Sequence, residues 1–228
     1  MKVISILAQK GGSGKTTLAT SLAVAAQNGG KSVAIIDLDP QATACRWGDR
    51  RNADPVIISI QPARLSNALA TAKENGADFV IIDTPPRAAD AAMAAAQAAD
   101  LILIPSRPTI NDLETIPTTK SLISGAGASA RIAVVLNAVP PQGPQREQAE
   151  EAVRGMGVPV YPVALGHRSA FIHSAVLGNT AQEIDRHGKA AQEIEQLYKF
   201  TCKLLTSKGK ENIDGCTEAR PAPSAQTA

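Results

Sequence analysis

Residues 3–22, VISILAQKGGSGKTTLATSL, decide the fold. An apolar run, VISIL, is followed at once by three glycines, two lysines and two threonines within KGGSGKTT at residues 10–17. Glycine is unfavourable inside a strand or a helix, so these glycines indicate a turn between an entering strand and a leaving helix. Open backbone N–H groups at a helix N-terminus attract anions. The stretch therefore predicts a phosphate-binding loop.

Individual side chains of the loop suit a nucleotide with a magnesium ion. Lys15 can reach the β- and γ-phosphates, and Thr16 can offer its hydroxyl to Mg²⁺. We expect the remaining contacts to the nucleotide from the loop residues Gly11, Gly12, Ser13, Gly14 and Thr17.

The loop departs from the general pattern G-x-x-x-x-G-K-[ST], because Gln9 stands where the first glycine is expected. A second lysine, Lys10, comes next. It cannot easily fold back onto phosphates that Lys15 already holds. It could reach phosphates that are bound by another subunit.

Composition limits the classes of protein that are open to this chain. Its 228 residues are 44% hydrophobic and 19% charged, which suits one large globular domain or at most two small ones. The net charge of +2 indicates no global attraction to polyanions, so any basic surface must be local. The three cysteines form no CxxC pair, there is no signal peptide, and no apolar stretch reaches the length of a membrane span. We therefore expect a cytoplasmic protein.

Short apolar runs recur along the chain, at 3–7, 32–37, 56–60, 79–83, 101–105, 132–137 and, less regularly, 158–163. Alanine-rich stretches with helical spacing separate them. This alternation predicts an α/β fold with a mostly parallel twisted sheet and helices on both faces. We expect a single domain over residues 1–205 and a disordered tail over residues 206–228, where periodic apolar residues are almost absent.

The variant loop KGGSGKTT resembles the deviant Walker A loop of the ParA/MinD ATPases, in which Lys10 would be the signature lysine. The resemblance covers about residues 1–205 and implies a P-loop NTPase fold. It is closest to the short ParA-type partition ATPases that lack an N-terminal DNA-binding domain, because the loop begins at residue 10.

The resemblance implies roles for acidic residues at strand ends. In IIDLDPQ, residues 35–41, Asp39 would orient the attacking water and Asp37 would help to hold the Mg²⁺ shell and the switch region. FVIIDTPP, residues 79–86, resembles a Walker B strand that ends in Asp83, a carboxylate of the Mg²⁺ shell. Asp112 stands in the acidic position before a dimer-facing helix, and Asn137 would contact adenine, although an ordinary strand-end turn also explains it.

By the same resemblance, Lys10, Lys15 and Asp39 form the catalytic set of a slow ATPase that uses ATP and Mg²⁺. ATP would close two copies face to face, so that each Lys10 reaches the phosphates of the other. The homodimer would bind DNA non-specifically on the nucleoid, and a small ParB-like or cargo-adaptor partner would stimulate hydrolysis. The cargo could be a plasmid, a chromosome, a receptor array or a microcompartment.

Contacts to DNA are the least defined part of this expectation. Arg168 matches a family position where a basic residue often contacts DNA, and Lys199 and Lys203 lie at i and i+4 on one helix face. A solvated helix face explains the lysines equally well. Three arginines, Arg46, Arg50 and Arg51, flank Trp47 and suit either DNA, a partner, or a packed tryptophan with surface arginines.

Two alternatives share the ATPase core. A MinD-like protein binds membranes through a basic amphipathic C-terminal helix, whereas this sequence ends in ARPAPSAQTA. An ATP-dependent metabolic ligase needs an acceptor site, for which we find no motif. The three histidines lack metal-ligand spacing, so we expect them to be structural or exposed.

Overall fold

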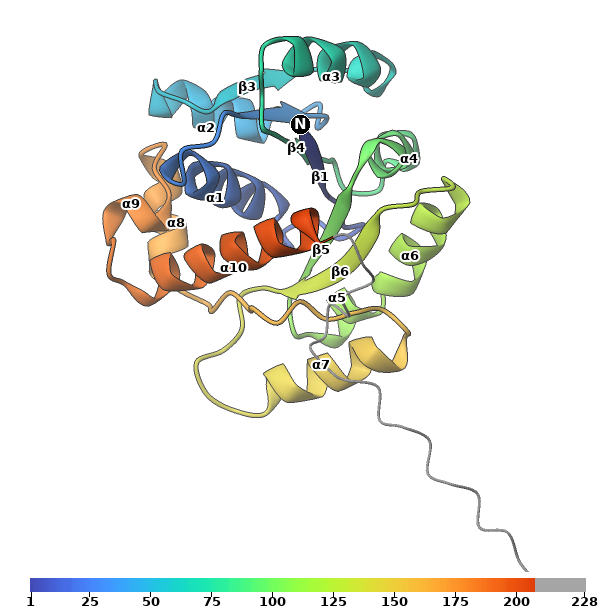
Figure 1. The fold of residues 1–228 in the computed structure, drawn as a ribbon. Coiled ribbons are helices and arrows are strands. Elements are labelled where there is room, and N and C mark those ends of the chain that lie inside the picture. Colours follow the sequence, from blue (N-terminus) through green and yellow to red (C-terminus); the bar gives the residue numbers. More distant parts are fainter. Residues whose placement is uncertain (208–228) are drawn as a thin grey trace, which may run out of the picture.

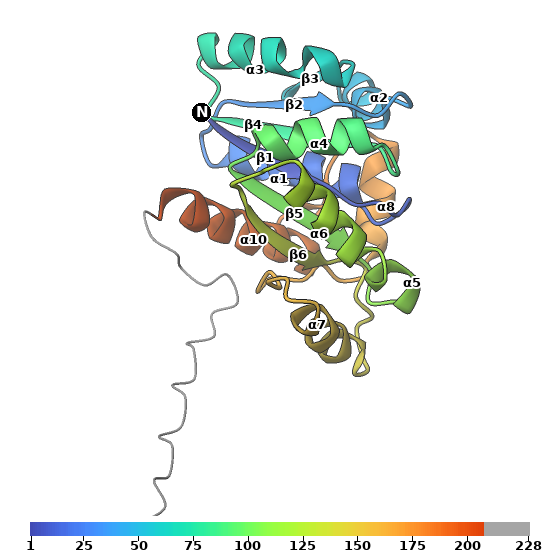
Figure 2. The same cartoon turned by 90° about the vertical axis from the view of Figure 1, so that its right-hand side faces the viewer.

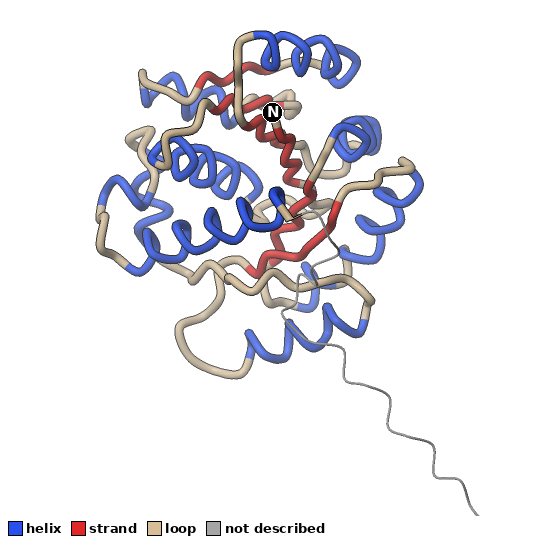
Figure 3. The backbone as a smooth tube through the Cα atoms, in the orientation of Figure 1, coloured by secondary structure: helices blue, strands red, loops and turns tan. Residues whose placement is uncertain are grey.

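The computed structural model describes residues 1–207 and shows a six-stranded, entirely parallel sheet with the strand order β3-β2-β4-β1-β5-β6 (Figure 1). Figure 3 shows the strands at the centre of the molecule with helices around them. The strands are β1 (Lys2–Ile6), β2 (Val33–Asp37), β3 (Val56–Ser59), β4 (Phe79–Asp83), β5 (Leu101–Ser106) and β6 (Arg131–Leu136). The predicted α/β class and parallel sheet are confirmed.

The seventh apolar run, residues 158–163, does not form a strand. It contributes one isolated bridge, between Val134 and Val160. Pro159 and Pro162 explain the difference, because proline has no backbone N–H to donate to a neighbouring strand.

Helices cover both faces of the sheet (Figures 1 and 2). They are α1 (Lys15–Asn28), α2 (Thr43–Arg51), α3 (Leu65–Glu74), α4 (Ala89–Ala98), α5 (Ile110–Leu113), α6 (Ile116–Gly125), α7 (Gln145–Gly155), α8 (Ser169–Val176), α9 (Ala181–Ile184) and α10 (Lys189–Thr206), with a 3-10 turn at Pro62–Arg64 before α3. Residues of α1, α2 and α10 join one apolar cluster, and residues of α3, α4, α6 and α7 join the other.

The two clusters lie on opposite faces of the sheet, so the strands other than the exposed edge strand β3 are buried on both sides. On β4, Val80 and Ile82 belong to one cluster, whereas Phe79 and Ile81 belong to the other. This two-sided burial explains why the strands are continuous apolar runs without alternation. Among the described residues, no helix has both the length and the apolar character that crossing a bilayer requires.

The strand register brings the expected site residues to one edge of the sheet. Because all strands are parallel, their carboxyl ends meet at the same edge, where ligands of such sheets bind. Ile6, the last residue of β1, is paired with Asp83, and Asp37 at the end of β2 is paired with Asp83 on its other side. Most of the expected tail, residues 208–228, lies outside the described residues.

Candidate nucleotide-binding site

The loop that joins β1 to α1 needs glycine at two positions. Gly12 and Gly14 have φ values of +74° and +94°, a region that favours glycine. A Cβ on Gly14 would also overlap the side-chain amide of Asn137. The carbonyl of Gly14 accepts from Leu18 N at 2.9 Å, so α1 begins directly at this residue. The predicted strand–turn–helix geometry is therefore present.

Asn137, at the end of β6, supports the loop from the neighbouring side. Its Nδ2 donates to the carbonyl of Ser13 at 2.8 Å, and its Oδ1 accepts from Ala138 N at 2.8 Å. Both ends of the amide are thus used to hold backbone. Sequence reasoning missed this contact with the loop, and the adenine contact expected of Asn137 stays a prediction.

Lys15 is enclosed by the loop it belongs to. The residue is 8% exposed, and its Nζ donates to the carbonyl of Lys10 at 3.2 Å. Burial lowers the pKa of Lys15, although the nearby Asp83 and Asp39 act in the opposite direction. A phosphate in the loop would compensate this desolvated charge.

Asp83 is buried, and one of its two carboxylate oxygens has no hydrogen-bond partner among the described residues. Its Oδ2 accepts from the Thr16 hydroxyl at 2.6 Å, while its Oδ1 accepts no hydrogen bond from any described residue. Burial, assisted by Asp37, raises the pKa of Asp83 to about 7, against the effect of the Thr16 hydrogen bond. A buried carboxylate oxygen next to a threonine hydroxyl supplies the hard oxygen ligands that Mg²⁺ prefers, directly or through water. These residues fit the ion.

Asp37 holds the segment that follows β2. Its Oδ1 accepts from Asp39 N and its Oδ2 from Ala44 N, both at 2.9 Å. Burial raises the pKa of Asp37, and these amide contacts oppose the shift. The half-buried Asp39 accepts from Gln41 N at 2.9 Å. In this structure Asp37 therefore orders the loop and the start of α2.

Lys10 lies near a second buried carboxylate, Asp112, which α5 carries. Arg107 binds Asp112 through two bonds of 2.8 and 3.0 Å. Burial works to raise the pKa of Asp112, but Arg107, with a smaller effect from Lys10, holds it below its usual value. Sequence reasoning found Asp112 and missed Arg107, whose opposite charge five residues earlier is the signal that could have indicated the pair.

Backbone strain surrounds this edge of the sheet. Among the described residues, four non-glycine residues have a positive φ, and three of them, Ala42, Arg87 and Ala138, follow β2, β4 and β6. Such conformations cost about 1 kcal/mol or more each and are concentrated at functional sites. No signal in the sequence indicates them, because alanine and arginine are not typical of this region.

The candidate DNA contacts are spread along α10. Arg168 pairs with Glu193 in the first half of α10, and Glu193 also accepts from Gly166 N at 3.1 Å. Lys199, in the second half, pairs with Glu195 at 2.6 Å, and Lys203 is exposed further on. The structure does not bring these cations into one compact cluster.

The tryptophan and the histidines considered in the sequence have ordinary surroundings. Trp47 is buried, as expected of a packed tryptophan, and all three histidines are exposed. Within the part of the chain that the structure describes, no three His, Cys, Asp or Glu residues are arranged to hold a metal among themselves.

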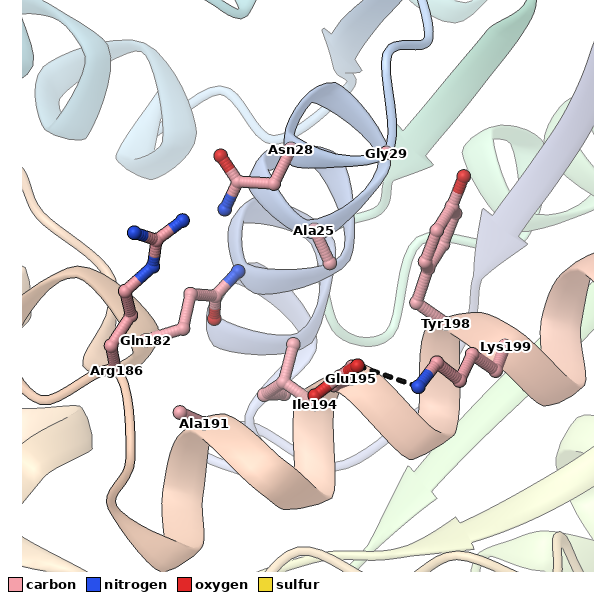
Figure 4. Close-up of a pocket in the computed structure, with 10 residues that line it drawn as sticks. All are labelled: Ala25, Asn28, Gly29, Gln182, Arg186, Ala191, Ile194, Glu195, Tyr198 and Lys199. Carbon is pink, nitrogen blue, oxygen red and sulfur yellow. Dashed lines mark ion pairs between the residues drawn. The ribbon is translucent and has the colours of Figure 1, made fainter.

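A cavity of about 410 Å³ lies at the other end of α1, between that helix, α9 and α10 (Figure 4). Its polar lining includes Gln182, Arg186 and Tyr198, and the Glu195–Lys199 ion pair lies along the α10 wall. None of the residues of the phosphate loop lines this cavity.

The fold and the loop geometry define a P-loop nucleotide-binding protein of the α/β class. The family model of the CobQ/CobB/MinD/ParA nucleotide binding domain matches residues 4–181, and the chain belongs to this family. The predicted family resemblance is confirmed. The chain is 33% identical over 210 residues to the maintenance of carboxysome distribution protein A of Gloeobacter kilaueensis, covering 90% of this chain and 94% of that protein. It is 26% identical over 213 residues to protein ParA of Rhizobium radiobacter, covering 92% and 88%.

Solved structures show the same fold. An apo McdA from Cyanothece superposes with a TM-score of 0.73 at 18% identity, covering 90% of this chain and 99% of that one. The septum site-determining protein MinD from Pyrococcus horikoshii OT3, in complex with Mg-ADP, gives a TM-score of 0.71 at 21% identity, covering 92% and 99%.

Proposed function

We propose that this protein is an ATPase that uses Mg²⁺, forms a homodimer with ATP, and positions or partitions a cellular cargo. The observation that carries the proposal is the geometry at the sheet edge, where the enclosed Lys15 lies beside the Thr16–Asp83 contact. The similarity to proteins named for carboxysome distribution and to ParA supports the positioning role.

The residues at this edge of the sheet have distinct roles in ATP binding and hydrolysis. Lys15 and the loop amides hold the β- and γ-phosphates, and Asn137 keeps the loop in shape through Ser13. Thr16 and Asp83 hold Mg²⁺, which neutralises charge on the phosphate oxygens when it is bound. Asp39 accepts a hydrogen bond from the attacking water and orients it towards the γ-phosphate.

Lys10 acts across the dimer. It is half-buried at the start of the loop, while Lys15 occupies the loop interior. When two copies close face to face, each Lys10 reaches the phosphates of the other copy and neutralises the charge that develops during transfer, as an arginine finger does. Hydrolysis is slow and a small ParB-like or cargo-adaptor protein stimulates it.

The ATP-bound dimer binds DNA without sequence preference, which retains it on the nucleoid. Arg168, Lys199 and Lys203 provide the phosphate contacts, and a dimer doubles them, so affinity rises with ATP. Hydrolysis separates the copies and releases the DNA.

A mobility shift on random-sequence duplex tests this function. We expect a shift with ATP and none with ADP, and it should weaken steeply between low and moderate salt. The double variant Lys199→Ala, Lys203→Ala and the single variant Arg168→Ala should reduce the shift at unchanged ATP affinity, whereas Arg154→Ala on α7 should not. No ATP-dependent shift at low salt would contradict DNA binding, and co-sedimentation with liposomes in its place would favour the MinD-like alternative.

A further inference from the structure

Arg51 attaches the end of α2 to α9. Its guanidinium binds both oxygens of Glu183, at 2.7 and 2.8 Å, and its Nε donates to the Asp54 carbonyl at 2.6 Å. Only 11% of the Arg51 side chain is exposed, and its guanidinium carbon lies 5.2 Å from the centre of the Trp47 ring. A two-bond arginine–carboxylate pair fixes distance and orientation together. We call the Arg51–Glu183 pair the α2 latch.

Neighbouring contacts strengthen the same attachment. Trp47 Nε1 donates to the Asn179 carbonyl at 3.1 Å, and Arg50 Nη2 donates to the Ala175 carbonyl at 3.2 Å. Glu183 is itself held, because its Oε2 accepts from the backbone N and the hydroxyl of Thr180, both at 2.8 Å. The latch therefore joins α2 to an anchored residue.

The other end of α2 contacts the candidate active site. Ala44 N and Cys45 N donate to Asp37 Oδ2 at 2.9 and 3.4 Å, and Asp37 Oδ1 accepts from Asp39 N at 2.9 Å. A helix of nine residues transmits its position from one end to the other as a rigid body. Asp37 itself is fixed by its place in β2, between β3 and β4. Asp39 lies in the short segment between β2 and α2, and its carbonyl accepts from Ala42 N at 2.7 Å, so the location of α2 bears on where Asp39 lies.

We propose that Arg51 is a positioning residue for hydrolysis, acting through α2 to keep Asp39 where it orients the attacking water. The inference rests on the proposed ATPase function. The phosphate loop joins β1 to α1 and is supported by Asn137. We therefore expect ATP binding to be independent of the latch. Loss of the latch should slow the chemical step and leave ATP binding in place.

Two variants of the latch and one control test the inference. Arg51→Ala removes the pair completely. Glu183→Gln removes its charge, and glutamine can still accept from Thr180 at this capping position. Arg154→Ala is the matched control, because Arg154 pairs with Glu150 at 3.1 Å on α7 and touches neither α2 nor the site.

We expect both latch variants to lower kcat about tenfold, since small displacements of a positioned group are costly. The dissociation constant for a fluorescent ATP analogue should stay within about twofold of the wild-type value, and the binding stoichiometry should be unchanged. The double variant should be no slower than Arg51→Ala, because both changes break the same contact. A loss of folding alone would lower the stoichiometry and would not produce this split.

Hydrogen exchange provides a measurement that does not use hydrolysis. Amides of residues 43–51 should exchange faster in Glu183→Gln, whereas those of α7 should not change. If the wild-type protein hydrolyses ATP and both variants have the same kcat as the wild type, the positioning role is overturned and the ATPase function stands. A wild-type protein that hydrolyses no ATP would overturn the proposed function, and the positioning role with it.

Discussion

Lys15 is the residue whose charge contributes most directly to nucleotide binding, because it is enclosed and desolvated before any phosphate arrives. A hydrogen bond to a charged group is worth about 1.5–3 kcal/mol, so Lys15→Ala should weaken ATP binding by about ten- to hundredfold. Titration with a fluorescent ATP analogue measures this loss. Lys31→Ala, at an exposed position after α1, is the control. Wild-type affinity in Lys15→Ala would contradict the assignment of the site.

Single residues also show how far the sequence could be interpreted. The loop and Asp83 could be predicted, because glycine, lysine and strand-end aspartate occur in a distinctive local order. The contact of Asn137 with Ser13 joins residues 124 positions apart, and nothing local to either one indicates it. The positive φ of Ala42 and Arg87 arises from loops that tertiary packing holds in place, against the preference of these residues.

Gly178, in the segment between α8 and α9, lies close to the backbone of α2. Its φ is +69°, and a Cβ there would overlap the backbone of Arg51. Gly76 has a similar φ of +75° with nothing within 4 Å of the added atom, so it isolates the conformational cost. We expect Gly76→Ala to lower the free energy of unfolding by about 1 kcal/mol. Gly178→Ala should lower it by about 1–3 kcal/mol more. Chemical denaturation measures both, and equal losses would show that α2 does not pack this tightly.

The elements themselves were largely predictable, because two-sided burial makes the inner strands continuous apolar runs, and the exposed edge strand β3 is apolar as well. Prediction was wrong for residues 158–163, where prolines outweigh the apolar pattern. The attachment of α2 to α8 and α9 could not be predicted, because Arg51 and Glu183 are 132 residues apart and each alone resembles a surface charge.

At the scale of the whole molecule, the parallel register unites the parts of the site. Asp37 and Asp83 occupy paired positions on β2 and β4, and Ile6 brings the phosphate loop to the same edge. Family membership and the α/β fold could be predicted from the loop because its local pattern is specific. The proposed association of two copies rests on the family resemblance of Lys10, because a dimer surface has no periodicity of its own in the sequence.

We propose that ATP joins two copies over their phosphate loops, and that hydrolysis of ATP, with the attacking water oriented by Asp39, separates them. Size-exclusion chromatography with light scattering measures this directly. With ATP and Mg²⁺, Asp39→Ala should have twice the mass of one chain, because it binds ATP and hydrolyses it poorly; with ADP it should have the mass of one chain. Lys10→Ala should bind ATP and still have the mass of one chain. A monomeric Asp39→Ala together with a Lys10→Ala that dimerises normally in ATP would contradict both roles.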